Sequence, residues 1–322
     1  MIVISGISSG MGISLARRLA ASGRHVRGFS RSVESVRHLL DHPNIELLAA
    51  DIREPFAVRA LCAKAEYVVH LAALSAPWGR YADFFQTNVL GTDALLQASI
   101  LAGVRRFVHV SSPSLYFDFT NRLGITEKTP FPKRFVNCYA ETKGLAEQLV
   151  DRATEAGLSC ITVRPRAVFG PHDQSLFPRL LRSCRKGLPC FNAWTDLTYV
   201  DNAAQALHLA MDAPDMCTGQ KYNITNGQPV LLNDFVEQLL SRLGHAVRRR
   251  RMPYHLAYAA AWIAEMGGCL RGREPALTRY GVGVLRYSQT FSIEKAVKEL
   301  HYNPEFTVEE GVDRYVSWLR FT

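Results

Sequence analysis

Tyr139 and Lys143 form a Tyr-x-x-x-Lys pair whose two side chains could act on one ligand. Positions four apart lie on the same face of a helix, one turn from each other. A phenol normally loses its proton near pH ~10, and a nearby ammonium lowers that pKa toward the range in which an acid or base works. The same spacing also occurs by chance on solvated helices, so the pair needs support from the rest of the chain.

The N-terminal residues follow the order strand, glycine-rich loop, helix. Met1–Ser5 is an apolar run typical of a buried strand, and the helical pattern of residues 13–22 ends at Gly23. Glycines between them allow backbone N–H groups to approach a pyrophosphate at the positive end of the helix, whereas elsewhere a glycine trio is more often only a turn. This context predicts dinucleotide binding. The residues predicted to hold the phosphates are Gly6, Ser8, Ser9, Gly10, Met11 and Gly12.

Arg31 follows the second predicted strand, residues 25–30, at a position where an NAD site usually has an acidic residue for the ribose 2′-hydroxyl. The local sequence is Ser-Arg-Ser, and a guanidinium can bind a 2′-phosphate through two hydrogen bonds, whereas a carboxylate would repel it. We therefore favour NADP(H) over NAD(H). The alternative interpretation is that Arg31 only stacks on adenine.

Further apolar strands at residues 45–50, 67–71 and 106–110 alternate with helical patterns near 55–64 and 81–102. This alternation predicts an α/β fold with a doubly wound, parallel Rossmann-type sheet. Ligands of such sheets lie beyond the carboxyl ends of the strands. The residues expected there are Asp51, Ile52, Leu71, Ala72, Ala73, Ser112 and Pro165.

Asn88 is a polar residue in the otherwise apolar helical pattern of residues 81–102. One interpretation is a core amide satisfied by backbone groups. The other is a residue that ties the active site to the sheet, and on that basis Asn88 joins the cofactor-site candidates.

The composition indicates an ordinary globular protein, with 322 residues, 48% apolar and 21% charged residues. No apolar run reaches the ~20 residues of a membrane span, and no signal peptide precedes the first strand. Seven scattered cysteines without a Cys-x-x-Cys motif predict reduced thiols in a cytoplasmic protein and no metal site. The net charge is +9 and the largest basic run is Arg248–Arg251. That run is a solvated face, an anion site or a contact to an acidic membrane; nucleic acid is not expected, because no aromatic residues are interleaved with it.

These motifs, in this order, resemble the extended branch of the short-chain dehydrogenase/reductase superfamily. The branch is marked by Val163-Arg-Pro-Arg-Ala-Val-Phe-Gly-Pro171 and Thr198-Tyr-Val-Asp-Asn202. Within it, Ala76–Phe85, Ser111–Ser114 and Arg273–Arg279 resemble the group of 3β-hydroxysteroid dehydrogenases and 2-alkyl-3-oxoalkanoate reductases. The glycine spacing G-x-x-x-G-x-G departs from the usual G-x-x-G-x-x-G of the branch, which weakens any transfer from its NAD-dependent epimerases.

The resemblance implies a division of roles among three residues. Tyr139 would be the general acid in reduction and the general base in oxidation. Lys143 would lower the tyrosine pKa and hold the nicotinamide ribose, and Ser112 would orient the substrate oxygen during hydride transfer. It also implies a homodimer that pairs helices near residues 84–102 and 139–156.

The second half of the chain is the expected substrate side. We expect a dinucleotide-binding domain over residues 1–165, to which the chain returns near 195–215, and a smaller, mostly helical substrate-binding region over 166–322. Helices are predicted at 176–182, at 201–211 with Asp201 as its cap, at 232–243 and at 308–319. Aromatic residues favour a hydrophobic substrate over a nucleotide sugar. The pocket candidates are Trp78, Ser114, Tyr116, Phe169, Trp194 and Tyr199, with Phe117, Phe177 and Trp262 as further aromatic candidates.

The apolar stretch Tyr254–Cys269 has three interpretations: a buried core helix, a lid over the substrate, or, together with the basic run at 248–251, a peripheral membrane contact. For the whole chain we favour an NADP(H)-dependent oxidoreductase that interconverts a ketone and a secondary alcohol on a hydrophobic 3-oxo/3-hydroxy acyl or steroid-like substrate. The alternatives are an NAD-dependent nucleotide-sugar epimerase or dehydratase, and a non-catalytic protein that binds NADP as a sensor.

Overall fold

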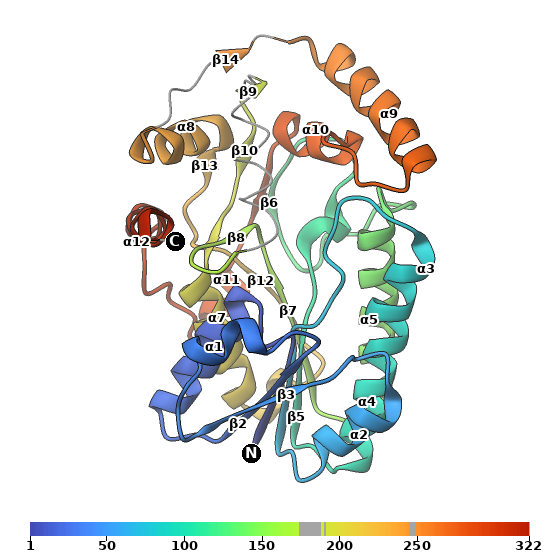
Figure 1. The fold of residues 1–322 in the computed structure, drawn as a ribbon, viewed down its shortest axis with the longest axis vertical. Helices are drawn as coiled ribbons and strands as arrows, with labels where there is room; N and C mark the ends of the chain where they lie inside the picture. The colour runs from blue at the N-terminus through green and yellow to red at the C-terminus, as the bar shows by residue number, and fades with distance from the viewer. Residues whose placement is uncertain (174–187, 190, 245–248, 251, 322) are drawn as a thin grey trace.

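A computed structural model describes residues 1–173, 188–189, 191–244, 249–250 and 252–321 (Figure 1). The helix predicted at residues 176–182, with the candidate Phe177, lies outside these residues, as does part of the basic run at 248–251.

A parallel sheet of seven strands forms the lower part of the molecule as seen in Figure 1 and confirms the predicted α/β, doubly wound fold. Its first strand, β1, lies between β2 and β4, so the strand order reverses beside β1, and ligands of such sheets bind at this point. The strand order across the sheet is β12 (Lys221–Ile224), β7 (Cys160–Pro165), β5 (Arg106–Val110), β4 (Tyr67–His70), β1 (Ile2–Ser5), β2 (Val26–Ser30) and β3 (Ile45–Ala49).

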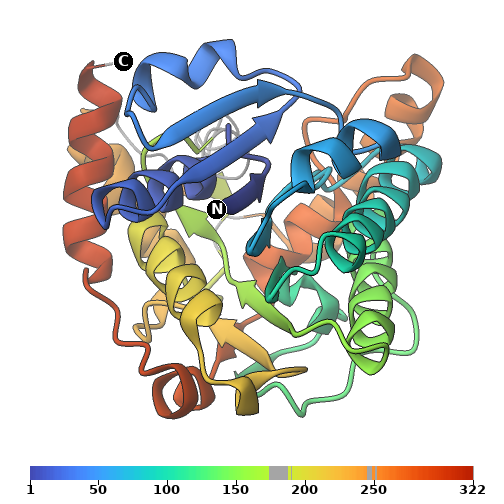
Figure 2. The ribbon, with the colours of Figure 1, turned by 90° about the horizontal axis from the view of Figure 1, so that it is seen from below.

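Helices cover both faces of this sheet, as Figure 2 shows. One face packs against α1 (Gly10–Ala21), α7 (Val200–Asp212) and α11 (Glu294–Leu300). The other packs against α2 (Pro55–Cys62), α4 (Gly91–Leu101) and α5 (Cys138–Glu155). Since both faces are buried, strands such as β1 are continuous apolar runs and do not alternate with polar residues.

The helical pattern of residues 81–102 is one continuous rod with a wide turn in its middle. It consists of α3 (Tyr81–Phe84), a π-helical segment η2 (Phe85–Leu90) and α4. Single π-helical turns occur frequently at functional sites. Here the wide turn carries Asn88, whose contacts are described below.

The upper part of the molecule is built around a smaller sheet of four short strands in the order β13 (Val230–Leu231), β10 (Trp194–Thr195), β15 (Gln289–Phe291) and β6 (Arg122–Ile125). Two further pairs join β11 (Thr198–Tyr199) to β8 (Val168–Phe169) and β14 (Arg249–Arg250) to β9 (Leu188–Pro189). The remaining helices are α8 (Leu232–Arg242), α9 (Tyr254–Arg271), α10 (Arg279–Arg286) and α12 (Val308–Phe321), and the 3₁₀ turns are η1 (Glu34–Leu39), η3 (Pro113–Tyr116) and η4 (Asp215–Cys217).

The two parts exchange chain segments. β6 comes from the first half of the sequence and joins the upper sheet, whereas α7 and β12 return to the lower one. The division into domains at residue 165 stays a prediction. The cysteines whose side chains the structure describes, Cys62, Cys138, Cys160 and Cys217, are free.

Asp201 is not the cap that we expected for α7. The helix begins one residue earlier, at Val200, and its N-cap is Tyr199, which makes no side-chain capping bond. Asp201 lies in the first turn, and its Oδ1 accepts a hydrogen bond of 2.5 Å from the Ser14 hydroxyl on α1. The carboxylate therefore joins two helices on one face of the sheet.

Candidate active site

The glycine loop forms a tight cradle at the start of α1. Gly6 has φ +74°, and a Cβ there would lie 2.7 Å from the Ala72 backbone nitrogen. A Cβ on Gly12 would lie 2.7 Å from the Gly6 carbonyl oxygen. Ser9 caps the helix, because its Oγ accepts a hydrogen bond from the Gly12 N–H. A compact loop that leads into a capped helix terminus is the arrangement that binds a pyrophosphate.

The helix begins three residues earlier than we expected, so Gly10 and Gly12 lie in its first turn. A Cβ on Gly10 would lie 2.9 Å from the carbonyl oxygen of Pro171. The segment after β8 therefore packs directly on the helix terminus. Larger residues at these glycines would push the loop away from the sheet.

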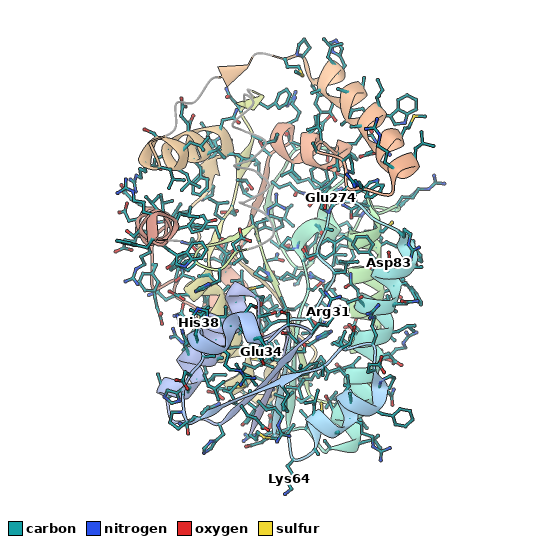
Figure 3. All side chains as sticks on the ribbon, viewed as in Figure 1. Arg31, Glu34, His38, Lys64, Asp83 and Glu274 are labelled. Atoms are coloured by element: carbon teal, nitrogen blue, oxygen red, sulfur yellow. The ribbon has the colours of Figure 1, made fainter. Side chains whose placement is uncertain are left out.

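Arg31 lines the cavity just after β2, whereas Arg53, which forms an ion pair with Asp51 after β3, does not line it. Arg31 is exposed and lines the cavity, and Figure 3 shows it in the middle of the molecule. Hydrogen bonds from Arg53, at distances down to 2.6 Å, lower the pKa of the Asp51 carboxyl, and the charge of Arg31 adds to this effect. The buried Ser30 hydroxyl lacks a hydrogen-bond partner at the same place. Arg31 and the Ser30 hydroxyl are groups that could bind an anion, whereas the Arg53 guanidinium is occupied by Asp51; Arg53 was not among the residues predicted from sequence.

Asn88 links the loop after β4 to the helix of the Tyr-Lys pair. Its Oδ1 accepts a hydrogen bond from Leu74 N (2.7 Å), and its Nδ2 donates to Leu74 O (3.2 Å) and to the Thr142 hydroxyl (3.1 Å). Both interpretations from sequence therefore apply, because a buried amide satisfied by backbone also positions the active-site helix. Asn88 does not line the cavity, so its action on a cofactor would be indirect.

Tyr139 is half-buried on α5 and lines the cavity beside Ser112, which precedes η3. Burial raises the pKa of the Tyr139 phenol, and hydrogen bonds with the Ser112 and Ser75 hydroxyls oppose this effect. Ser75 lies in the loop after β4 and was not among the sequence candidates. The only signal for it was a serine close behind the Ala72-Ala73 pair.

Lys143 is 2% exposed, and its ammonium does not produce the lowered tyrosine pKa that we expected. Its Nζ donates a hydrogen bond of 2.7 Å to the carbonyl of Val110 and lies 3.4 Å from His109 Nε2. Burial lowers the lysine pKa to about 8. The lysine is thus held by the end of β5, and the raised pKa of Tyr139 means that the tyrosine keeps its proton.

A buried ion pair fixes α5 against the sheet behind these residues. Arg164 on β7 donates two hydrogen bonds to the Glu147 carboxylate, of 2.7 and 2.5 Å, and a third of 2.5 Å to the Tyr116 hydroxyl. The side chains of Arg164 and Glu147 are 1% and 3% exposed. Burial raises the Tyr116 pKa to about 12. Tyr116 is therefore part of the support of the site and does not line the cavity.

One continuous cavity of about 1680 Å³ runs from the glycine loop past Tyr139 to the C-terminal helices. Figure 3 shows Glu274, another lining residue, toward those helices. Many of the side chains that close this upper end are aliphatic. They include Leu197, Val200, Leu232, Met252, Ala257, Leu277, Val282, Val284 and Leu285.

The structure brings most of the predicted site residues to this cavity. All the cofactor-site candidates line it except Gly12 and Asn88, and so do Ser114 and Phe169 among the pocket candidates. Trp194 is 45% exposed on β10, Tyr199 is buried in the core, and Trp78 lies near Gly268 of α9; none of the three lines the cavity. Arg166 and Tyr280 line it and were missed.

Helix α9 is not the buried core helix that was one of our interpretations. Ala257 and Ala261 are buried, and Ala257 lines the cavity, so the inner face of the helix closes the substrate end. The outer face exposes large apolar side chains, and Figure 1 shows the helix at the edge of the molecule. The exposed ones are Leu256 (55%), Trp262 (50%), Ile263 (64%), Met266 (52%) and Leu270 (90%).

Within the described part of the chain, no helix is both long and apolar enough to cross a membrane. Among the same residues, no group of three or more His, Cys, Asp or Glu side chains could hold a metal ion.

The sequence profile of the NAD dependent epimerase/dehydratase family matches residues 2–225. A 2-alkyl-3-oxoalkanoate reductase of Stenotrophomonas maltophilia is 33% identical over 97% of this chain and 97% of its own length. A 3beta-hydroxysteroid-dehydrogenase/decarboxylase (isoform 1) of Arabidopsis thaliana is 31% identical over 85% of this chain and 66% of its own.

The fold of UDP-glucuronic acid 4-epimerase from Bacillus cereus, solved in complex with NAD, superimposes with a TM-score of 0.79. That match covers 99% of this chain and 98% of the epimerase at 19% identity, and so it shows the fold alone. With the profile and relatives above, the chain belongs to the NAD-dependent epimerase/dehydratase family, in the extended short-chain dehydrogenase/reductase fold, and is an oxidoreductase of that family.

Proposed function

We propose that the protein is an NADP(H)-dependent ketoreductase, acting reversibly as an alcohol dehydrogenase, on a hydrophobic substrate with a 3-oxo or 3-hydroxy group. The observation that carries the proposal is the single cavity. It joins the glycine cradle to Tyr139, Ser112 and Lys143 and then continues into an upper end lined by many aliphatic side chains. A nucleotide sugar would need many polar donors at that upper end.

The cofactor preference rests on the surface around Arg31. The residues Ser30-Arg31-Ser32 present no carboxylate at the end of β2, and the Ser30 hydroxyl has no partner. Arg31 and Ser30 would hold a 2′-phosphate, while the start of α1 would hold the pyrophosphate. When bound, NADPH supplies the hydride.

The residues of the chain divide the remaining work. Ser112 donates a hydrogen bond to the ketone oxygen and Tyr139 gives it a proton as negative charge develops. Because burial raises the pKa of Tyr139, the residue holds its proton at neutral pH, which is the form that a reductase needs. In the oxidative direction the phenol oxygen takes the proton back. The names of the Stenotrophomonas and Arabidopsis relatives, a reductase of oxoalkanoates and a hydroxysteroid dehydrogenase, support this class of substrate.

The test begins with protein stripped of nucleotide. Calorimetry compares NADPH with NADH, and absorbance follows NADPH oxidation with a panel of 3-oxoacyl and 3-oxosteroid ketones. We expect tighter NADPH binding and ketone-dependent oxidation. Tyr139→Phe should lower kcat by about 10²- to 10⁴-fold, the range of a general acid, while NADPH binding stays. Arg31→Glu should weaken the binding of NADPH and leave the binding of NADH unchanged.

Three outcomes would contradict the proposal. Tightly retained NAD with no ketone turnover would favour the epimerase or dehydratase. NADPH binding without turnover of any ketone would favour a binding protein. Normal turnover by Tyr139→Phe would remove the proposed acid.

A further inference from the structure

Arg166 is a buried guanidinium with one unpaired donor, Nε, and no ion pair among the described residues. The residue is 6% exposed and lines the large cavity just past the end of β7. Its Nε has no hydrogen-bond partner, and Nη2 makes one long bond of 3.5 Å to the Thr195 hydroxyl. A buried charged group with an unpaired donor costs folding free energy, so a guanidinium kept in such a place beside a cavity indicates a ligand.

The neighbours of Arg166 do not supply a close ion pair. The charge of Asp196 acts on it, but no carboxylate of the described residues forms an ion pair with Arg166. Asp196 is itself fully buried, and its Oδ2 accepts a hydrogen bond of 2.7 Å from the Phe291 N–H. The Phe291 ring covers the guanidinium, with its centroid 5.6 Å from Cζ. The guanidinium is thus held by the Phe291 ring, a long hydrogen bond to Thr195, a hydrogen bond with the Tyr280 hydroxyl and the charge of Asp196, and its Nε remains unpaired.

The backbone fixes the position of Arg166 before any ligand arrives. Its N–H donates to the carbonyl of Ile224 at 2.9 Å, and its own carbonyl accepts from the Thr198 hydroxyl at 2.6 Å. The next residue, Ala167, has φ +42°, a conformation uncommon for a residue with a side chain. Strained, over-determined backbone of this kind clusters at ligand sites.

Tyr280 connects Arg166 to the reacting centre. The Tyr280 hydroxyl and the Arg166 guanidinium form a hydrogen bond, and the same phenol is close enough to Tyr139 for the two to interact electrostatically. Both Arg166 and Tyr280 line the cavity together with Tyr139. An anionic group bound to Arg166 therefore lies a short way from a ketone oxygen held by Ser112 and Tyr139.

We propose that Arg166 binds the carboxylate of the substrate, so that the enzyme acts on free 3-oxo or 3-hydroxy acids and discriminates against esters and thioesters. This assignment rests on the proposed function. A carboxylate matches a guanidinium through two parallel hydrogen bonds, and an ester lacks both the charge and the second acceptor geometry. In a 3-oxo acid the carboxylate is separated from the carbonyl carbon by one carbon atom. The apolar upper cavity would then hold the alkyl chains.

The experiment compares a long-chain 2-alkyl-3-hydroxy acid with its methyl ester, each oxidised with NADP⁺. Wild type should prefer the acid. Arg166→Met keeps the volume and removes the charge, and it should lower kcat/KM for the acid by about ten- to a hundredfold, as expected for lost hydrogen bonds to a charged group. The kcat/KM for the ester should change less than about threefold. The variant should therefore lose the preference of the wild type for the acid over the ester. Arg166→Lys should restore part of the preference, because the charge remains without the planar fork.

Calorimetry separates this proposal from the proposed function. The acid is titrated into enzyme saturated with NADP⁺, for wild type and Arg166→Met, and NADP⁺ binding reports the integrity of each variant. If neither compound is oxidised but the acid binds in an Arg166-dependent way, the assignment of the carboxylate site stands and the reaction class is wrong. If turnover occurs and Arg166→Met lowers acid and ester equally, or the wild type shows no preference, the residue is structural and the assignment is overturned.

Discussion

The ammonium of Lys143 is buried, and the cost of burying this charge lowers the stability of the folded protein. Its pKa falls from 10.5 in an exposed lysine to about 8, because burial penalises the ammonium. Since a tenfold change in an acid dissociation constant corresponds to about 1.4 kcal/mol, the charged lysine costs roughly 3 kcal/mol at neutral pH. As the pH rises from about 8 toward 10.5, the unfolded state holds more protons than the folded state, and this penalty disappears.

We therefore expect Lys143→Met to stabilise the cofactor-free protein. The free energy of unfolding in urea should rise by about 1–3 kcal/mol at pH 7, less than the full penalty because the bond to Val110 is lost. The gain should shrink near pH 10. Lys133→Met, at an exposed lysine, is the control and should change little at either pH. A variant that is equally destabilised at both pH values would disprove the argument.

The residues that belong to local motifs could be predicted from sequence. Tyr139 and Lys143 are one helical turn apart, and the glycines lie between a strand and a helix, so the local sequence is enough to predict their chemistry. Arg166 and Ser75 reach the cavity because segments that are distant in the sequence pack together, and the local sequence does not predict such packing. The pKa of Tyr139 was expected in the wrong direction, because the ammonium of Lys143 faces the Val110 carbonyl.

Helix α9 has two apolar faces with different surroundings. The inner face closes the cavity, and the outer face exposes Ile263 and Leu270. At its C-terminal end Arg271 and Arg273 are exposed, so apolar and basic groups lie together. That combination is typical of helices that lie on an anionic lipid surface.

We expect the protein to sediment with vesicles that contain phosphatidylglycerol, and less with pure phosphatidylcholine. The double variant Ile263→Glu, Leu270→Glu should weaken vesicle binding by about tenfold or more, since both apolar burial and charge attraction are lost. Leu123→Glu, at a leucine that is 66% exposed on β6, should leave it unchanged. If the double variant sedimented with the vesicles as strongly as the wild type, α9 would be excluded as the membrane contact. If the double variant changed only the KM for the substrate and left vesicle binding unchanged, both faces of α9 would belong to a lid over the substrate.

Long elements were easier to predict than short ones. Five strands of the large sheet were predicted as mostly apolar runs, and their limits match the structure within one residue, whereas no limits were predicted for β7 and β12. The strands of the upper sheet are two to four residues long and carry no period of their own. The wide turn at Phe85–Leu90 was also not foreseen, because a π-helical turn has the same composition as the α-helix around it.

The helices expected to pair two subunits expose apolar side chains. Leu90 of η2 is 51% exposed and Leu101 of α4 is 64% exposed, and Phe56 of α2 nearby is 90% exposed. These residues border a groove of about 850 Å³ between α2 and α4. Exposed apolar side chains that gather at a groove are typical of an interaction site.

At the scale of the whole molecule we therefore expect a homodimer. Light scattering coupled to gel filtration should give twice the chain mass of 36.0 kDa. The double variant Leu90→Arg, Leu101→Arg should shift the protein to the monomer mass by placing like charges across the two-fold axis. The control Met216→Arg, at an exposed methionine on η4, should leave the protein at the dimer mass. A wild type that elutes as a monomer at high concentration would contradict this expectation.

The continuity of the cavity has a kinetic consequence. The glycine cradle and the apolar upper end share one space, and the residues Ser112 and Tyr139 lie between them. If a dinucleotide fills the lower end, it forms one wall of the substrate site, and the site is complete only after the nucleotide has bound. We therefore expect ordered binding in which the nucleotide binds first and leaves last, and its release should limit the turnover rate when the chemistry is fast.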